Sequence, residues 1–165
     1  MRPKQVDRRF FMYNFEFSYP TRLIFGKEQR FRIGAELKAA GASRVLIVYG
    51  GGSAVRSGLI GMVHESLVKE GIDYLDFGGI RSNPELSKVI EGIALCRSES
   101  IDFILACGGG SVIDSSKAIA LGAANDINIW ETIATWAQPD KALPISVLLT
   151  LPAAASETGC AFVIS

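Results

Sequence analysis

The sequence predicts an α/β fold, in which an open, mostly parallel sheet is flanked by helices. Two observations support this prediction. Short apolar runs alternate along the chain with longer segments of helical periodicity. The joints between them are short and rich in glycine, and Gly-Gly-Gly-Ser occurs twice. The chain has 165 residues, of which 48% are hydrophobic, and this is enough for one domain with a substantial core.

Residues 1–11 differ from the rest of the chain, because basic side chains crowd a segment with little periodicity. We expect a poorly ordered N-terminal extension here and a single domain over residues 12–165. A strand pattern begins directly at Met12, so the alternative is that Met12 is the true first residue. The extension has no apolar core behind its basic residues and is therefore a poor signal peptide.

Seven segments have the patterns of strands. Apolar and polar residues alternate over 13–18, which is typical of a half-buried strand. The fully apolar run 45–48 instead indicates a parallel strand covered on both faces. In chain order, the predicted strands are 13–18, 22–25, 45–48, 72–77, 103–107, 145–149 and 161–164.

Helical patterns lie between these strands. Gly41 and Gly71 follow two of them at the position of a C-terminal cap. Pro84 suits the first turn of another helix. The predicted helices span residues 29–40, 59–70, 84–99 and 111–124.

Composition argues against several classes of partner. The 17 basic and 17 acidic residues cancel, so the net charge gives no reason to expect a nucleic acid or an anionic membrane. No apolar run approaches the length of a membrane span. Cys96, Cys107 and Cys160 form no CxxC pair and no metal-type spacing. We expect small buried thiols, reduced in a cytoplasmic protein.

The strongest local signal lies where the predicted strand 103–107 runs into Gly108, Gly109 and Gly110, and a helix opens at Ser111. Glycine has no Cβ, so a ligand can approach the backbone closely. The free N–H groups and the dipole of a helix N-terminus both favour an anion. A pyrophosphate satisfies both conditions, and the alternative is a glycine turn with an ordinary helix cap and no ligand.

Two neighbouring features extend this signal. Ser111 and Asp114 have the spacing of a capping box, so Asp114 is either a structural cap or a direct ligand. A second glycine stretch follows the strand 45–48, and ligands of open α/β sheets collect beyond the carboxyl ends of strands. Both stretches could therefore face one crevice, although the second alone could be a structural turn. Its residues are Gly50, Gly51, Gly52 and Ser53.

A series of motifs over 12–165 resembles iron-containing (group III) alcohol dehydrogenases of the butanol dehydrogenase kind. The motifs are Tyr13-Asn14-Phe15-Glu16-Phe17, Pro20-Thr21, Ile24-Phe25-Gly26, Val48 to Ser53, Asn83-Pro84, Gly108 to Asp114 with Lys117 to Ala120, Pro144-Ile145, and Thr150 to Ala153 with Ser156-Glu157. The resemblance implies a Rossmann-like dinucleotide-binding domain of the dehydroquinate-synthase type. It also implies a C-terminal helical domain that binds a divalent metal, usually iron, and we expect this domain to be missing from the chain.

The resemblance also assigns roles to residues. Gly108, Gly109, Gly110 and Ser111 would hold the pyrophosphate of NAD or NADP, and Asp114 would support that loop. Thr150 and Leu151 would lie near the nicotinamide, with Asn83 a weaker candidate. The segment after Pro152 reads Ala-Ala-Ala-Ser-Glu where many relatives have Thr-Gly-Ser-Glu, which puts contacts there in doubt. His64, the single histidine, is expected to be a partly exposed helical residue. Lys117 is expected to face solvent, and the alternative, which the resemblance suggests, is a functional role.

The second glycine stretch bears on the choice of cofactor. NAD-preferring relatives often carry Asp at the position of Gly50. Glycine leaves no carboxylate to repel a 2′-phosphate, and Ser53 can donate to one, so NADP is predicted over NAD.

The expected function is therefore the cofactor-binding portion of an NAD(P)-dependent, metal-type enzyme that interconverts primary alcohols and aldehydes, inactive as this chain alone. A homodimer is a further expectation of the resemblance. The alternative is a non-catalytic nucleotide-binding remnant or regulatory module. A glycerol dehydrogenase or dehydroquinate synthase would also fit the fold, but the Asn14-Phe15 opening favours the alcohol dehydrogenases.

Overall fold

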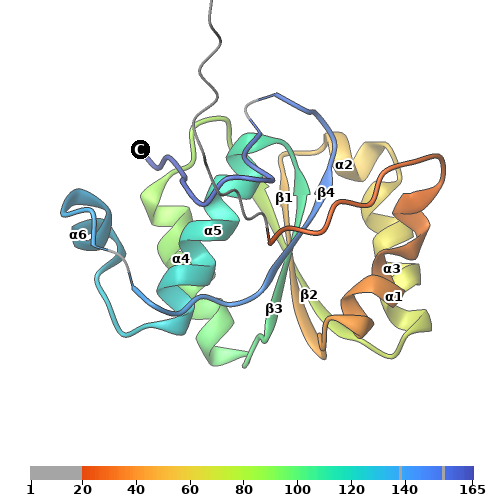
Figure 1. Ribbon diagram of the computed structural model, residues 1–165, viewed down its shortest axis with the longest axis horizontal. Helices are drawn as coiled ribbons and strands as arrows, with labels where there is room; N and C mark the ends of the chain where they lie inside the picture. Colours follow the sequence, from red (N-terminus) through yellow and green to blue (C-terminus); the bar gives the residue numbers. More distant parts are fainter. Residues whose placement is uncertain (1–19, 138, 154) are drawn as a thin grey trace, which may run out of the picture.

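A single parallel sheet organises the computed structural model, which describes residues 20–137, 139–153 and 155–165 (Figure 1). Its strands are β1 (Arg44–Gly50), β2 (Asp73–Ile80), β3 (Phe103–Gly108) and β4 (Ile145–Leu149), in the order β2-β1-β3-β4. All neighbours pair in parallel, which confirms the α/β prediction. The helices are η1 (Gln29–Arg32), α1 (Ile33–Ala39), α2 (Ser53–Arg56), α3 (Leu59–Lys69), α4 (Leu86–Ser98), α5 (Gly110–Ala124) and α6 (Ile129–Ala134).

The helices form two layers, with α1 and α3 on one face of the sheet and α4 and α5 on the other (Figure 1). The central strand β1 supplies both cores. Val45 and Ile47 pack in the cluster of α1 and α3, while Leu46 and Val48 pack in that of α4 and α5. All four side chains are fully buried. The continuous apolar run therefore reflects a strand covered on both faces, as predicted.

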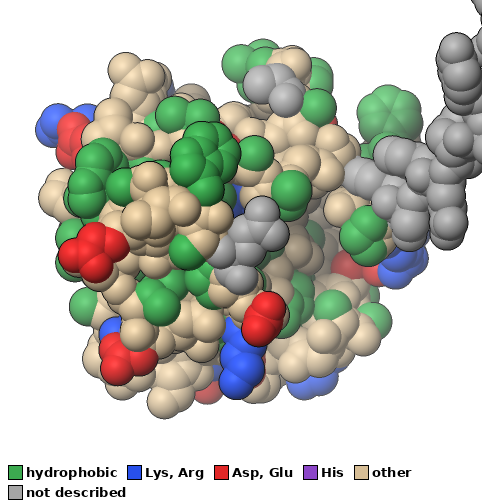
Figure 2. All heavy atoms as spheres, turned by 60° about the vertical axis from the view of Figure 1, so that its left-hand side comes forward, with side chains coloured by type: hydrophobic (Ala, Val, Ile, Leu, Met, Phe, Trp, Pro, Cys, Tyr) green, Lys and Arg blue, Asp and Glu red, His purple; other side chains and the backbone are tan. Residues whose placement is uncertain are grey.

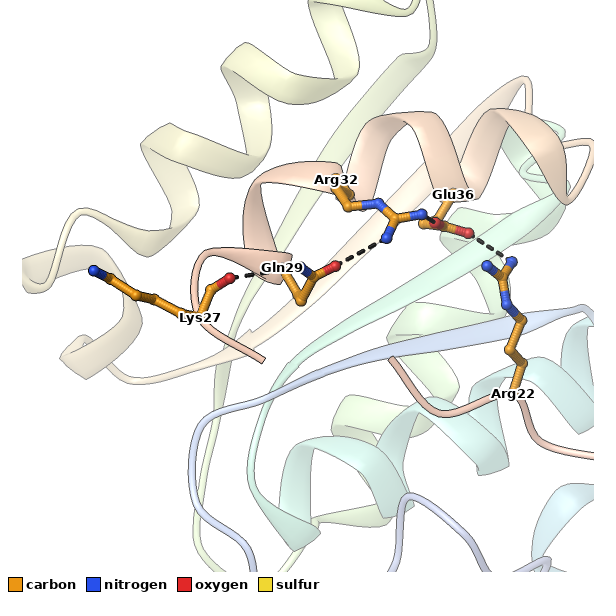
Figure 3. A network of polar contacts seen from close by, with 5 residues as sticks. All are labelled: Arg22, Lys27, Gln29, Arg32 and Glu36. Atoms are coloured by element: carbon orange, nitrogen blue, oxygen red, sulfur yellow. Dashed lines mark hydrogen bonds and ion pairs between the residues drawn. The ribbon is translucent and has the colours of Figure 1, made fainter. Parts of the chain in front are cut away.

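The predicted strand 22–25 is not part of the sheet that the described residues form. These residues form no ladder with any strand in the described part of the chain, and Leu23 and Phe25 are exposed. The predicted strand 13–18 and the predicted extension 1–11 lie outside the described residues. The segment 22–25 contacts α1 through an ion pair, in which Arg22 lies 2.7 Å from Glu36 (Figure 3).

The predicted strand 161–164 does not pair with any strand in the described residues. Its apolar residues Phe162 and Ile164 pack against the core of α4 and α5 without joining the sheet. The chain end is fixed at the start of α4, where the Ser165 N–H donates to the Pro84 carbonyl at 2.8 Å. The alternation of apolar and polar residues over 161–164 thus indicates that one side of an extended segment is buried, and here that side faces helices.

Helix boundaries depart modestly from prediction. The helix expected from Pro84 begins two residues later, at Leu86, and the helix expected from Ser111 begins at Gly110. Gly41 and Gly71 end helices in the left-handed conformation, with φ of 89° and 65°, as predicted. No described helix is both long and apolar enough to span a bilayer.

The prediction that all three cysteines are buried is wrong for one of them. Cys96 and Cys107 are buried as expected, but Cys160 is exposed because it lies in the segment outside the sheet. On the side of α4 and α6, hydrophobic side chains reach the surface between polar ones (Figure 2). Those exposed on these elements include Ile90 and Trp130.

Candidate functional site

Most of the predicted site residues lie at the carboxyl edge of the sheet. β1 and β3 are adjacent, so the glycine stretches that begin at Gly50 and Gly108 lie side by side. On the other side of β3, Thr150 follows β4 and its N–H donates to the Gly108 carbonyl at 3.0 Å. Asn83 lies in the turn after β2, at the same edge but two strands away from β3, with a left-handed φ of 63°.

Neither packing nor backbone conformation requires glycine at three positions of these loops. A Cβ built on Gly109 would come no closer than 3.8 Å to Leu151, and one built on Gly110 would lie 4.0 Å from Ser156 Oγ. A Cβ on Gly51 would meet no atom within 4 Å. None of the three has a positive φ. The backbone at these positions is therefore open to close approach from outside.

Two other glycines have reasons within the protein. A Cβ on Gly108 would lie 2.5 Å from Val112 Cγ2, so glycine allows α5 to pack close to the strand. Gly52 has a φ of 142°, a backbone conformation that side chains rarely adopt. These two residues shape the loops whatever the loops bind.

The N-terminus of α5 faces this edge without a side-chain cap. Gly109 is the N-cap residue, in an extended conformation, and the described part of the chain supplies no side-chain cap there. The predicted Ser111–Asp114 capping box is therefore wrong, because the helix begins before Ser111 and a capping box needs its serine at the N-cap. The uncapped N–H groups and the positive end of the helix dipole remain to attract an anion.

Asp114 contacts the segment that follows β4. Its Oδ1 accepts from Ser156 Oγ at 2.7 Å, and its Oδ2 accepts from the Val163 N–H at 3.2 Å. Lys117 was expected to face solvent, and this is wrong. Its Nζ donates to the Ala161 carbonyl at 2.7 Å, and burial lowers the pKa of the amine. These contacts span 42 to 49 residues, so no local pattern could have revealed them.

A shallow hollow lies beside the first glycine stretch. Arg56, at the end of α2, folds back over the loop, so that a Cβ on Gly52 would lie 2.7 Å from its Nη1. Burial, with the Asp76 carboxylate nearby, raises the pKa of Tyr49, whose phenol stays neutral at the rim. Among the described residues, no carboxylate lines the hollow. Its lining residues are Tyr49, Gly50, Gly51, Gly52, Val55, Arg56 and Gly79.

Sequence reasoning did not single out Arg56. Its signal is the short helix that begins at Ser53, because one helical turn returns residue 56 to the loop that precedes it. The Arg56 N–H accordingly donates to the Gly52 carbonyl at 2.9 Å.

The described residues hold no group of three or more His, Cys, Asp or Glu side chains that could bind a metal ion. His64 lies on α3 and is partly exposed, as predicted. Its Nε2 lies 3.0 Å from Asp76 Oδ1, and its ring stacks on Tyr74 with 4.5 Å between centroids.

The chain matches the family model for iron-containing alcohol dehydrogenases over residues 20–165. It is 47% identical over 154 residues to the probable NADH-dependent butanol dehydrogenase 1 of Bacillus subtilis, covering 93% of this chain and 40% of that protein. It is 40% identical over 157 residues to the NADPH-dependent aldehyde reductase YqhD of Escherichia coli, again covering 93% of this chain and 40% of that protein.

Solved structures give the same result. The crystal structure of NADH-dependent butanol dehydrogenase A from Thermotoga maritima superposes with a TM-score of 0.82 at 43% identity, over 86% of this chain and 36% of that one. That of E. coli YqhD has a TM-score of 0.83 at 38% identity, over 92% and 39%. The chain thus spans about 40% of the length of the curated relatives it matches.

Proposed function

Because the chain belongs to the iron-containing alcohol dehydrogenase family, we propose that residues 12–165 form its cofactor-binding domain and that the carboxyl edge of the sheet binds NAD or NADP. The observation that carries the proposal is the open backbone at Gly109 and Gly110, where the protein itself gives no reason for glycine. A pyrophosphate supplies that reason, because it needs close approach to the uncapped N-terminus of α5.

Different residues at this edge bind different parts of the cofactor. Gly108 to Ser111 bind the pyrophosphate, with N–H groups and the helix dipole opposing its negative charge. Thr150 and Leu151 lie on the β4 side and contact the nicotinamide half, whereas Gly50 to Ser53 lie on the β1 side and contact the adenosine half. Asn83 borders the same edge. The bound nicotinamide would carry the hydride, and the protein's part is to position it.

For a protein with the full length of these relatives, the proposed reaction is the interconversion of primary alcohols and aldehydes. A divalent metal, with iron the family's namesake, would polarise the substrate oxygen there. The described residues do not fit such a metal, and the steps assigned to this chain are confined to binding and orienting the dinucleotide.

The first prediction tests the pyrophosphate loop through Gly109→Val. The added Cβ has room in the free protein, so the fold should be kept, while the branched side chain blocks the phosphate. We expect dinucleotide affinity to fall at least roughly 100-fold, because both the helix-terminus contacts and the backbone approach are lost. Isothermal titration calorimetry with NADPH and NADH measures the effect.

Gly61→Val is the matched control. Gly61 lies on an exposed side of α3, and a Cβ there meets no atom within 4 Å. This variant should bind like the parent. A folded Gly109→Val protein that retains the parent's dissociation constant would remove the basis of the proposal.

We also propose that NADP(H) is preferred over NAD(H). The described lining of the hollow at the first glycine stretch contains no carboxylate to repel a 2′-phosphate. Ser53 can donate to that phosphate, and the Arg56 guanidinium lies directly over the loop. Relatives of both kinds exist, since one is named as NADH-dependent and another as NADPH-dependent.

The second prediction concerns this preference. Arg56→Met keeps most of the side-chain volume and should weaken NADPH binding by roughly ten- to 100-fold while changing NADH binding little, because a charge-assisted contact to phosphate is lost. Gly50→Asp should shift the preference further towards NADH. Lys69→Met, exposed at the far end of α3, is the control. A parent protein that binds NADH more tightly than NADPH would reverse the assignment.

A further inference from the structure

The segment after β4 crosses the carboxyl edge of the sheet, from β4 past α5 to the start of α4 (Figure 1). Both ends are fixed by backbone hydrogen bonds. At one end the Thr150 N–H donates to the Gly108 carbonyl at 3.0 Å. At the other end Ser165 and Leu86 are joined, since the Leu86 N–H donates to the Ser165 carbonyl at 3.1 Å. The segment therefore forms one wall of the proposed cofactor site.

Two side chains of α5 form hydrogen bonds with the middle of this segment. Asp114 accepts from Ser156 Oγ and from the Val163 N–H, and Lys117 donates to the Ala161 carbonyl. Only 14% of the Asp114 side chain and 13% of the Lys117 side chain are exposed. The described residues of the segment are mostly exposed and add no strand to the sheet. These polar contacts therefore attach its middle, beside the packing of Phe162 and Ile164 on the core.

The same geometry argues against a direct contact of Asp114 with the cofactor. A carboxylate pointing at a pyrophosphate would repel it. Both Asp114 oxygens are instead used by the segment, and Lys117 Nζ lies 4.0 Å from Oδ1, where it offsets the negative charge. The contact also brings Ser156 to the glycine loop, because its Oγ would be 4.0 Å from a Cβ on Gly110.

We propose that Asp114 and Lys117 are positioning residues that hold 156–163 against α5 and so complete the nicotinamide side of the cofactor site. This inference rests on the proposed function, because it takes the β4 side to be the nicotinamide side. The inference assigns the nicotinamide riboside to the wall. The adenosine and the main pyrophosphate contacts are assigned to Gly50 to Ser53 and to the N-terminus of α5, although Ser156 borders the glycine loop. Loosening the wall should therefore weaken the whole dinucleotide but not its adenosine diphosphate portion.

The third prediction compares NADPH and ADP binding to Asp114→Asn, Ser156→Ala and Lys117→Met, each made in the full chain. Asp114→Asn loses the charge and one acceptor, and Ser156→Ala removes only the hydroxyl. We expect roughly tenfold weaker NADPH binding for Asp114→Asn, the effect of losing a hydrogen bond to a charged group, with ADP binding unchanged. Ser156→Ala changes a mostly exposed segment, so it tests the same contact should Asp114→Asn fold poorly.

A second readout does not depend on the cofactor. In Asp114→Asn without nucleotide, deuterium exchange should rise in peptides covering 156–163 and stay unchanged in those covering β1. Asp126→Asn is the matched control, since Asp126 is exposed beyond the end of α5.

Equal losses for NADPH and ADP would overturn the inference, because they would mean a general structural effect. Unchanged NADPH binding together with unchanged exchange would also overturn it. A parent chain that binds neither nucleotide would instead overturn the proposed function, and with it the role assigned to the wall. A selective NADPH loss accompanied by faster exchange in 156–163 is the supporting result.

Discussion

At the scale of single residues, Asp102 joins the amino ends of the two central strands. Its Oδ1 accepts from the Ser43 N–H at 3.1 Å and the Arg44 N–H at 3.0 Å, and its Oδ2 accepts from the Ser43 hydroxyl. Burial alone would raise the pKa of this carboxyl, but the hydrogen bonds outweigh burial and lower the pKa. The ionised form is thus the one that the folded chain stabilises.

The fourth prediction follows from that direction. Asp102→Asn should lower the free energy of unfolding at pH 7 by about 1–2 kcal/mol, because hydrogen bonds to a charged acceptor are lost. With the folded pKa below the unfolded value of about 3.9, the stabilisation is complete above roughly pH 5 and disappears as pH falls through the folded pKa. Urea unfolding of both proteins at several pH values measures this. A difference that stays constant in acid would contradict the assignment.

The positions and contacts of some residues could be predicted from the sequence alone, and those of others could not. The position of Gly108, Gly109 and Gly110 between a strand and a helix was predictable, because the three parts are contiguous in the sequence. The partners of Asp102 and Asp114 were not, because those contacts join residues 58 and 42 positions apart. For Asp114 the local pattern was misleading, since its spacing from Ser111 fits a cap that the actual helix start does not allow.

At the scale of elements, α1 and α3 pack so closely that one glycine is indispensable. A Cβ on Gly34 would lie 2.2 Å from the Ser66 carbonyl oxygen, a backbone atom that cannot move independently of α3. The Gly34 N–H also donates to Ser66 Oγ at 2.9 Å. The two helices are therefore in near-direct backbone contact at this point.

The fifth prediction uses two glycines in these two helices. Gly34→Ala should destabilise the fold by about 1–3 kcal/mol through overpacking, which exceeds the gain of up to about 1 kcal/mol in helix propensity. Gly61→Ala, where an added Cβ meets nothing within 4 Å, should keep only the gain and stabilise the fold. Chemical denaturation of the two variants distinguishes them by sign. Stabilisation by both would show that α1 can shift freely against α3.

Elements were predictable where burial and periodicity agree, as in β1, β3 and α3. They were not where an apolar pattern lacks a partner in the sheet. Residues 161–164 have strand-like composition, yet their apolar side chains pack on helices. Hydrophobic periodicity reports which side of a segment is buried, and it carries no information about what covers that side.

At the scale of the whole molecule, the parallel architecture followed from the alternation of strands and helices, but the strand order did not. The order β2-β1-β3-β4 places the earliest strand inside the sheet and its two neighbours on opposite sides. This arrangement brings the two glycine stretches together at one edge. The sequence shows the two stretches but contains no local pattern that specifies their adjacency.

The interior place of β1 has a consequence for synthesis on the ribosome. As the chain emerges, β1 can pair with β2 on one side, but its other edge stays unpaired until residues 103–108 have been made. During that interval a strand whose central residues 45–48 are all apolar presents free N–H and carbonyl groups, the arrangement that favours association with other chains. The nascent protein should be most dependent on chaperones just before β3 leaves the exit tunnel.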